Sequence, residues 1–328
     1  MTEGQAAPPS AAPPAAQPAT GPAAPADRTP LTVLLGMLYC GAAFGGSFMF
    51  MRIAAPDLPA LVVACGRVGI AALILLVVSL VVRPSSLGPL ARDWRGFLVM
   101  GVFMTAGPFL LFAYAERFIT AGLGGILNAT TPLFTVIVVT IWLRQKLTLK
   151  RVVALIVGFV GVGVIVGLEG LHIAPDAYLG VISALVAASL YGVGLTYARR
   201  RMSHLEPLPL VVGQLVAATL LLLPGAVLSL PDAHFELDSS LAVLGIATFS
   251  TAIALPVLFY VNRIAGPMVS SSIPFLNPIF SVLWGVVFLS ETVSPTLVGG
   301  SLLIFVSLAL ILDLPLPARL RQGRAAEA

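Results

Sequence analysis

The stretch LNATTPLF at residues 127–134 places an amide, two hydroxyls and a proline inside an apolar run from Phe118 to Leu143. A second stretch, IPFLNPIF at residues 273–280, repeats this pattern in another apolar run. A proline removes one helical hydrogen bond, and in a membrane the freed carbonyl must find a partner inside the protein. We therefore expect transmembrane helices whose polar groups face a cavity, with kinks at Pro132, Pro274 and Pro278. The alternative is that these prolines only bend the helices for packing.

The composition of the chain is that of a polytopic membrane protein. Of 328 residues, 58% are hydrophobic and only 10% are charged, whereas soluble domains carry roughly 25% charged residues. Runs with few or no charges predict an all-α fold with ten transmembrane helices, each near the roughly 20 residues that cross a membrane core of about 30 Å. These helices are expected at about residues 31–51, 60–82, 96–115, 118–143, 151–168, 177–198, 208–230, 241–262, 267–289 and 294–314.

The basic residues and the two tails give a predicted orientation. Residues 1–29 are rich in proline and alanine and are expected to be a disordered tail, and residues 317–328 are expected to form a basic tail. With a cytoplasmic amino terminus, all of the 18 Lys and Arg residues except Arg52, Arg67 and Arg117 lie in cytoplasmic loops or tails. Because short cytoplasmic loops are enriched in Lys and Arg, we expect a multi-pass plasma-membrane protein with both termini cytoplasmic.

The chain contains an internal repeat. A shift of 146 residues aligns Pro132 with Pro278, and a shift of 147 aligns Arg67 with Gln214. Residues 30–170 and 171–316 are each expected to hold five helices, and because five is odd the second copy must be inverted. The basic loop RPSSLGPLARDWR of the first copy has a counterpart, PDAHFELDSS, without Lys or Arg, as inversion requires. Inverted repeats around a midplane site are a feature of transporters that work by alternating access.

Several short motifs recur at equivalent places in the two copies. The first copy has Gly45 after an aromatic residue, Arg67 in its second helix, Pro132-Leu133-Phe134 in its fourth, and Gly158, Gly161 and Gly163 in its fifth. The second copy has Tyr191-Gly192, Asn277-Pro278-Ile279-Phe280 and Leu289-Ser290-Glu291. Over about residues 31–314 the chain resembles the drug/metabolite transporter superfamily, in particular its ten-helix branch with two EamA domains. It departs from that pattern at Phe44, where tryptophan is usual, and at Gln145, where glutamate is usual. The resemblance implies export or exchange of small metabolites, often amino acids or their derivatives.

Arg67 is the most informative single residue. A charge within a membrane helix costs on the order of 2.5–3.5 kcal/mol on insertion scales, so it normally faces a cavity or a partner. Arg67 either receives a substrate carboxylate or phosphate, or it snorkels outward and braces helix ends. Other polar and aromatic residues near the middle of helices describe a mildly polar, aromatic-walled pocket, although each of them could instead serve helix packing. The candidate substrate-binding residues are Tyr39, Phe44, Ser47, Arg67, Phe112, Asn128, Ser189, Tyr191, Gln214, Thr248 and Asn277.

The acidic residues bear on energy coupling. Proton-driven carriers usually have an acidic residue deep in the bilayer, whereas Glu116, Glu291 and Asp313 lie at predicted helix ends. We therefore expect facilitated export or exchange rather than tight proton symport.

Other functional classes fit the sequence less well. An intramembrane hydrolase would need a nucleophile with a base or a motif such as H-E-x-x-H, but the three histidines are far apart in loops, so we expect no enzyme, no metal and no cofactor. An exchanger of phosphorylated or nucleotide-linked sugars would need several basic residues in the cavity, and only Arg67 qualifies. The expected partners are membrane lipid and a neutral or zwitterionic small molecule, without nucleic acid. A homodimer and a non-transporting scaffold are left as alternatives.

Overall fold

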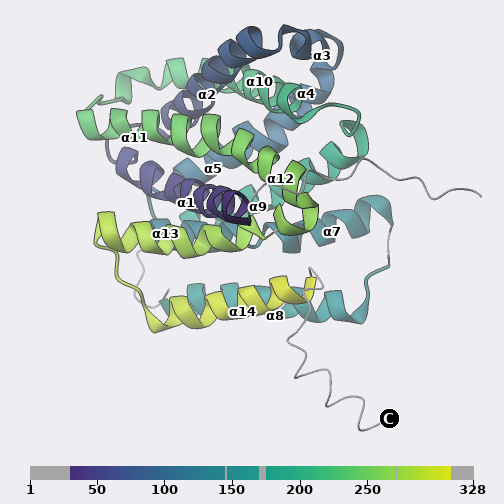
Figure 1. The fold of residues 1–328 in the computed structure, drawn as a ribbon. Helices are drawn as coiled ribbons and strands as arrows, with labels where there is room; N and C mark the ends of the chain where they lie inside the picture. The colour runs from purple at the N-terminus through teal and green to yellow at the C-terminus, as the bar shows by residue number, and fades with distance from the viewer. Residues whose placement is uncertain (1–29, 145, 170–174, 271, 312–328) are drawn as a thin grey trace, which may run out of the picture.

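The computed structural model describes residues 30–144, 146–169, 175–270 and 272–311. Both expected tails, residues 1–29 and 317–328, and Gln145 lie outside these ranges. Within them the chain is helical (Figure 1). Its α-helices are α1 (Pro30–Ala54), α2 (Ala60–Val82), α3 (Gly88–Arg92), α4 (Trp94–Met100), α5 (Gly107–Ala115), α6 (Ala121–Asn128), α7 (Thr131–Leu143), α8 (Leu149–Glu169), α9 (Pro175–Arg201), α10 (Pro207–Leu228), α11 (Leu237–Ala247), α12 (Ala254–Ser270), α13 (Ile273–Leu289) and α14 (Pro295–Ile311). Four short segments join them: the 3₁₀ turns η1 (Pro84–Leu87) and η3 (Leu230–Asp232), and the π-helical segments η2 (Gly101–Ala106) and η4 (Thr248–Ile253).

The helices account for ten membrane spans. Eight helical stretches are long and apolar enough to cross a membrane, including α4–η2–α5, α6–α7 and α11–η4–α12 taken as single spans. The other two, α13 and α14, are apolar helices of 17 residues each, which is about 25 Å at 1.5 Å per residue. The predicted all-α fold with ten transmembrane helices is confirmed.

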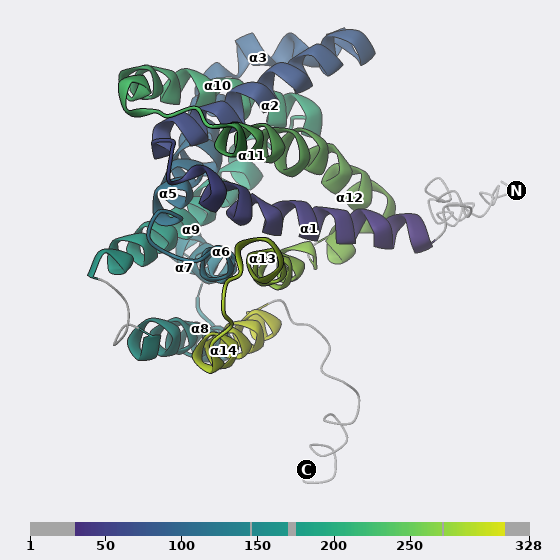
Figure 2. The same ribbon diagram turned by 90° about the vertical axis from the view of Figure 1, so that its left-hand side faces the viewer.

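The two five-helix halves pack mainly against each other. Helix α1 packs on α13, α2 on α10, α5 and α7 on α9, and α8 on α14. The repeat makes α9 the counterpart of α1 and α13 the counterpart of α7, so the α1–α13 contact has its equivalent in α9–α7. Figure 2 shows α1 between α12 and α13, and α8 beside α14 at the lower edge of the molecule. This exchange of partners is the arrangement of two inverted repeats.

Equivalent glycines allow the closest of these contacts. A Cβ atom at Gly45 would lie 2.8 Å from the carbonyl oxygen of Asn277 and 2.8 Å from the amide nitrogen of Ser281. A Cβ at Gly192, which is 147 residues later, would lie 2.9 Å from the amide nitrogen of Thr135. Small residues let membrane helices approach until their backbones touch. The α1–α13 and α9–α7 contacts therefore depend on these two glycines.

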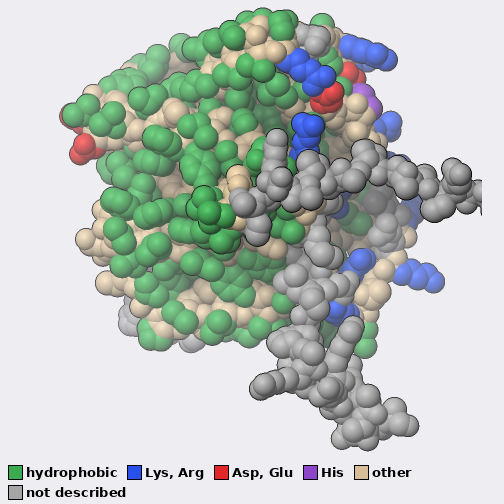
Figure 3. All heavy atoms as spheres, in the orientation of Figure 1, with side chains coloured by type: hydrophobic (Ala, Val, Ile, Leu, Met, Phe, Trp, Pro, Cys, Tyr) green, Lys and Arg blue, Asp and Glu red, His purple; other side chains and the backbone are tan. Residues whose placement is uncertain are grey.

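The exterior of the helices is apolar. Large hydrophobic side chains are exposed along most of the spans, among them Leu73, Val81, Ile141 and Leu220. In Figure 3 such side chains cover the face in view, and Lys and Arg side chains gather toward its right-hand end. A patch of this extent on a soluble protein would be an interaction or aggregation surface, but in a bilayer it is the surface that faces lipid.

The fourth predicted helix, 118–143, is two helices. Helix α6 begins after Thr120, whose hydroxyl oxygen accepts from the amide of Leu123 at 3.3 Å, and it ends at Asn128. Helix α7 begins at Thr131 with Pro132 in its first turn, a place where proline removes no intrahelical hydrogen bond. The Thr130 hydroxyl donates to the Leu127 carbonyl at 2.6 Å and the Thr131 hydroxyl to the Asn128 carbonyl at 2.8 Å. The hydroxyls of the LNATTPLF stretch thus satisfy backbone groups that the break leaves free.

The second half is interrupted at an equivalent place. Gly266 in α12 has φ +80°, a conformation that glycine adopts readily and other residues rarely do. The expected end of the eighth helix at 262 and start of the ninth at 267 flank this glycine. Pro274 lies in the first turn of α13, and Pro278 lies inside that helix.

Candidate substrate cavity

A cavity of about 190 Å³ lies between the two halves. Its walls come from both repeats, with α1, α2, η2, α5 and α6 on one side and α9, α10, η4, α12 and α13 on the other. It is lined by Phe44, Ser47, Phe48, Met51, Arg67, Met104, Thr105, Phe109, Phe112, Asn128, Tyr191, Gln214, Leu215, Ser250, Thr251, Leu255 and Asn277.

Two π-helical segments shape this cavity. Segments η2 and η4 are 147 residues apart, so they are equivalent in the repeat. A π-helical turn contains one more residue than an α-helical turn, and such turns occur frequently at functional sites. Thr105 of η2 and Ser250 and Thr251 of η4 are buried and line the cavity. The Thr251 hydroxyl donates to the carbonyl of Ile246, five residues earlier, at 3.0 Å.

Arg67 is held in the cavity wall from two directions. Its Nε donates to Oγ1 of Thr251 at 3.1 Å, and its guanidinium carbon lies 3.6 Å from the centre of the Phe109 ring. The side chain is only 5% exposed. Among the described residues it has no carboxylate partner within ion-pair distance. Arg67 therefore does not snorkel outward, and it presents a buried positive charge to the cavity.

Three buried polar atoms on the other half are also without a partner. Oε1 of Gln214, Oδ1 of Asn277 and Oγ of Ser250 make no hydrogen bond to any described residue, and all three residues line the cavity. An unsatisfied buried polar group costs about 1–3 kcal/mol. Because most buried polar groups in proteins are satisfied, such a cluster indicates water or a ligand. The second repeat thus offers acceptors to the cavity, while Arg67 of the first repeat offers donors.

Aromatic rings form the remaining wall. Phe48 and Phe112 meet edge to face with ring centres 5.3 Å apart, and Phe112 lies 6.3 Å from Tyr191. Tyr191 also lies 6.5 Å from Phe109, the ring against which Arg67 stacks. Such offset and edge-to-face pairs are favourable aromatic geometries. The cavity therefore has a rigid apolar side and a polar side.

Comparison with known proteins identifies the chain. Residues 31–167 and residues 178–313 each match the model of the EamA-like transporter family. The protein belongs to the EamA-like transporter family. It is a multi-pass membrane transporter of the drug/metabolite transporter superfamily, as its motifs indicated.

Individual relatives of this EamA-like transporter are distant and cover most of its length. It is 24% identical over 275 residues to the uncharacterized transporter YoaV of Bacillus subtilis, which is 83% of this chain and 94% of YoaV. It is 26% identical over 259 residues to the uncharacterized inner membrane transporter YedA of Escherichia coli, which is 76% of this chain and 81% of YedA. A solved crystal structure with 18% sequence identity superimposes with a TM-score of 0.62 over 86% of this chain and 98% of the other. That similarity extends to the fold.

The cavity of the EamA-like transporter brings together most of the candidate residues predicted from sequence. Eight of the eleven line it: Phe44, Ser47, Arg67, Phe112, Asn128, Tyr191, Gln214 and Asn277. The structure places the other three elsewhere. The Tyr39 hydroxyl donates to the carbonyl of Phe249, and the Ser189 hydroxyl donates to the carbonyl of Val186 in its own helix. Thr248 opens the π-helical segment, and the wider turn directs Ser250 and Thr251 to the cavity instead.

Some lining residues of the EamA-like transporter were not predicted. Phe109 holds Arg67, but an aromatic residue in an apolar helix gives no signal of its own. The repeat could have found it, because Phe109 and Leu255 are 146 residues apart and both line the cavity. The same holds for Thr105 and Thr251.

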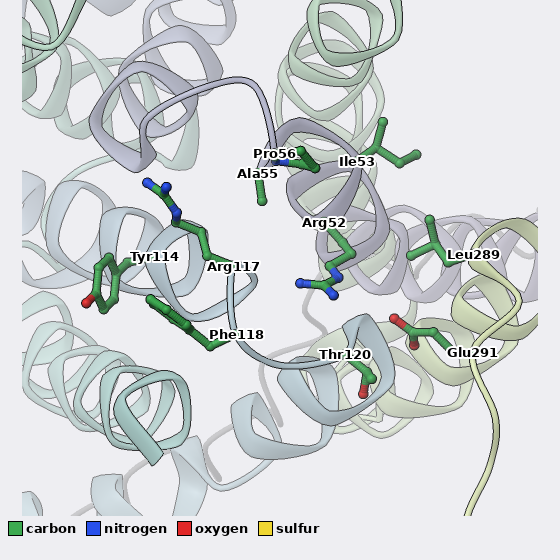
Figure 4. A pocket seen from close by; sticks show the side chains of 10 residues that line it. All are labelled: Arg52, Ile53, Ala55, Pro56, Tyr114, Arg117, Phe118, Thr120, Leu289 and Glu291. Atoms are coloured by element: carbon green, nitrogen blue, oxygen red, sulfur yellow. The ribbon is translucent and has the colours of Figure 1, made fainter. Parts of the chain in front are cut away.

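A second, larger hollow lies at one end of the helices, where the loop charges predict the outer face. It has a volume of about 920 Å³ and is shown in Figure 4. Arg52 and Glu291 point toward each other across it, and Arg117 projects into it from the α5–α6 connection. It is lined by Arg52, Ile53, Ala55, Pro56, Tyr114, Arg117, Phe118, Thr120, Leu289 and Glu291.

Proposed function

We propose that this protein exports small neutral or zwitterionic metabolites, such as amino acids or their derivatives, by alternating access around the central cavity. The observation that carries the proposal is the distribution of polar groups between the halves. Arg67 of α2 supplies unpaired donors, and Gln214 and Asn277 supply unpaired acceptors. A site with a cation on one wall and amide oxygens on the other suits a molecule that carries both charges.

The size and lining of the cavity suit a small ligand. Sites for drug-sized ligands have volumes of roughly 300–1,000 Å³, and this cavity has about 190 Å³. An α-carboxylate would accept hydrogen bonds from Arg67, because guanidinium groups bind carboxylates in a two-pronged geometry. An α-ammonium group would donate to Gln214 and Asn277, and the substrate side chain would lie against Phe112 and Tyr191.

The same features make a highly charged substrate a poorer fit. Arg67 is the only Lys or Arg among the residues that line the cavity. A sugar phosphate or nucleotide-linked sugar carries at least two negative charges, and transferring them from water without further cations would be unfavourable.

The proposed orientation places both termini in the cytoplasm. Its support is the concentration of Lys and Arg at one end of the helices, visible in Figure 3, together with the positive-inside rule. The large hollow around Arg52 and Glu291 would then open to the outside.

Counterflow in liposomes tests the function. Purified protein is reconstituted into liposomes loaded with one unlabelled amino acid, and the uptake of the same labelled amino acid is followed. We expect transient accumulation for some neutral amino acids, competition among them, and none in liposomes that contain Asn277→Leu. Sugar phosphates serve as the contrasting panel. Counterflow of sugar phosphates without that of any amino acid would overturn the substrate class.

A further inference from the structure

A second unpartnered group lies between the cavity and the outer hollow. The side chain of Glu116, directly after α5, is 0% exposed, and neither Oε1 nor Oε2 has a hydrogen-bond partner among the described residues. A Cβ atom added to Gly124 of α6 would touch both Oε1 of Glu116 and the ring of Phe48. The carboxyl group is therefore enclosed between α5, α6 and α1. No part of the substrate site described above requires it there.

The position of Glu116 connects the two spaces. Phe112, one helical turn earlier, lines the central cavity, and so does Phe48. Arg117, the next residue, lines the outer hollow. The Glu116 carboxyl thus lies in the layer that separates the cavity from the outer hollow.

The charged groups around Glu116 are few. Arg52 of α1 donates through Nη1 to the backbone carbonyl of Glu116 at 2.6 Å, so its charge serves the main chain. Glu291, after α13, faces Glu116 and accepts from the amides of Ala121 and Gly122 at 2.8 and 3.1 Å. Those amides form the amino terminus of α6, which stabilises a negative charge on Glu291. Arg117, Asp57 and Asp176 are the other ionisable groups at this end of α5, of the α1–α2 connection and of α9.

These surroundings determine the protonation of Glu116. A buried carboxylate without hydrogen-bond donors is strongly disfavoured, and a second carboxylate nearby disfavours it further. Glu291 has two backbone donors and Glu116 has none. The proton of this pair therefore resides on Glu116 in the conformation described here.

We propose that Glu116 is a proton-binding site that controls opening of the transporter on its outer side. With the proton bound, the neutral side chain lets α5, α6 and α1 pack together and closes the layer. When these helices separate, water from the outer hollow reaches the carboxyl, the proton leaves to that water, and Arg52 and Arg117 are the nearest cations for the carboxylate. The proposal deepens the transport function proposed above and rests on it. Because the proton binds and leaves from the same side, this site regulates opening without moving protons across the membrane.

The direction of the pH dependence follows from the proton balance. Opening releases one proton to the outer solution, so the ratio of open to closed molecules rises with outer pH. For a single proton the ratio changes by at most tenfold per pH unit. Low outer pH therefore holds the protein closed on this side.

A distance measurement without substrate tests the proposal independently of transport. Spin labels at Asp176→Cys and Thr292→Cys, both exposed at the outer end, report the separation of α9 from the residues after α13, with Cys40 and Cys65 replaced by alanine. We expect a longer-distance population that grows between pH 5 and pH 9. Glu116→Gln cannot ionise and is expected to keep the low-pH distance distribution throughout. Glu236→Gln, a carboxyl exposed at the same end, serves as the matched control and is expected to behave like the parent.

Two outcomes would overturn the proposal. One is a parent protein whose distances do not change with pH, and the other is a Glu116→Gln variant that still responds like the parent. Should Glu116→Gln not fold, Gly124→Ala gives a second test, because its methyl group would displace the carboxyl toward the hollow. That variant is expected to populate the longer distance already at pH 5, and a parent-like distribution would count against the proposal. A failure of counterflow alone would reject the proposed substrate and leave the distance result standing.

Discussion

Replacing Arg67 by glutamine tests the substrate site most directly, because glutamine is the residue at the equivalent position, 214, in the other half. A hydrogen bond to a charged group contributes about 1.5–3 kcal/mol, and each 1.4 kcal/mol changes affinity tenfold. Arg67→Gln is therefore expected to weaken binding of the transported substrate by roughly 10- to 150-fold. Arg67→Lys keeps the charge but loses the planar fork and the stacking on Phe109, so we expect an intermediate affinity.

The stability of the Arg67→Gln variant should change much less than its affinity. The variant loses the hydrogen bond to Thr251 and the contact with Phe109, and the latter contributes about 0.5–2 kcal/mol. It also relieves the desolvation of a buried, unpaired charge, which acts in the opposite direction. We expect a folded protein in detergent whose free energy of unfolding changes by no more than about 2 kcal/mol.

Equilibrium binding of labelled substrate to purified protein measures the loss. Arg83→Gln is the matched control, since Arg83 ends the same helix but is exposed and pairs with Glu206 at the surface; its affinity should equal that of the parent. If Arg67→Gln bound substrate as tightly as the parent, Arg67 would have only a structural role and the proposed site would be wrong.

Three further substitutions test the packing that surrounds the site. Gly45→Ala should lower the free energy of unfolding by about 1–3 kcal/mol, because its methyl group would press on the backbone of α13; Gly163→Ala, which meets nothing within 4 Å, is the control, and equal thermal unfolding of the two variants would contradict the contact. Glu291→Ala removes both acceptors at the start of α6 and should lower the free energy of unfolding by about 1–2 kcal/mol in the same assay. Thr251→Val deprives Nε of Arg67 of its partner, so a binding assay should show weaker substrate affinity, whereas an unchanged affinity would mean that Thr251 does not position Arg67.

The spans, their number and the repeat could be read from the sequence because lipid imposes a simple rule. Each crossing needs a long apolar helix, and charges such as Arg83 and Arg144 mark where a crossing ends. Arg67 and Gln214 were found for the same reason, since a polar side chain is conspicuous in an apolar helix. Eight of the eleven predicted residues lie in the cavity because the middle of most helices faces the partner half.

The internal irregularities of the helices could not be read in the same way. The π-helical segments η2 and η4 carry ordinary residues, and one extra residue in a turn changes the direction in which every following side chain points. Thr248 was selected where Ser250 and Thr251 line the cavity. Ser189 is in a regular helix, but its hydroxyl is occupied by the carbonyl of Val186. Hydropathy records how polar a position is and not which way it faces.

The pairing of α8 with α14 has a consequence for biogenesis. The two helices cross where a Cβ at Gly161 would lie 2.7 Å from the carbonyl oxygen of Gly300, and a Cβ at Gly300 would lie 2.6 Å from that of Gly161. Helix α8 is made midway through synthesis, and its main packing partner is the last helix of the chain. While the ribosome completes the second half, α8 must wait in the bilayer with its glycine surface uncovered, so assembly of the native molecule can finish only after synthesis of its final helix.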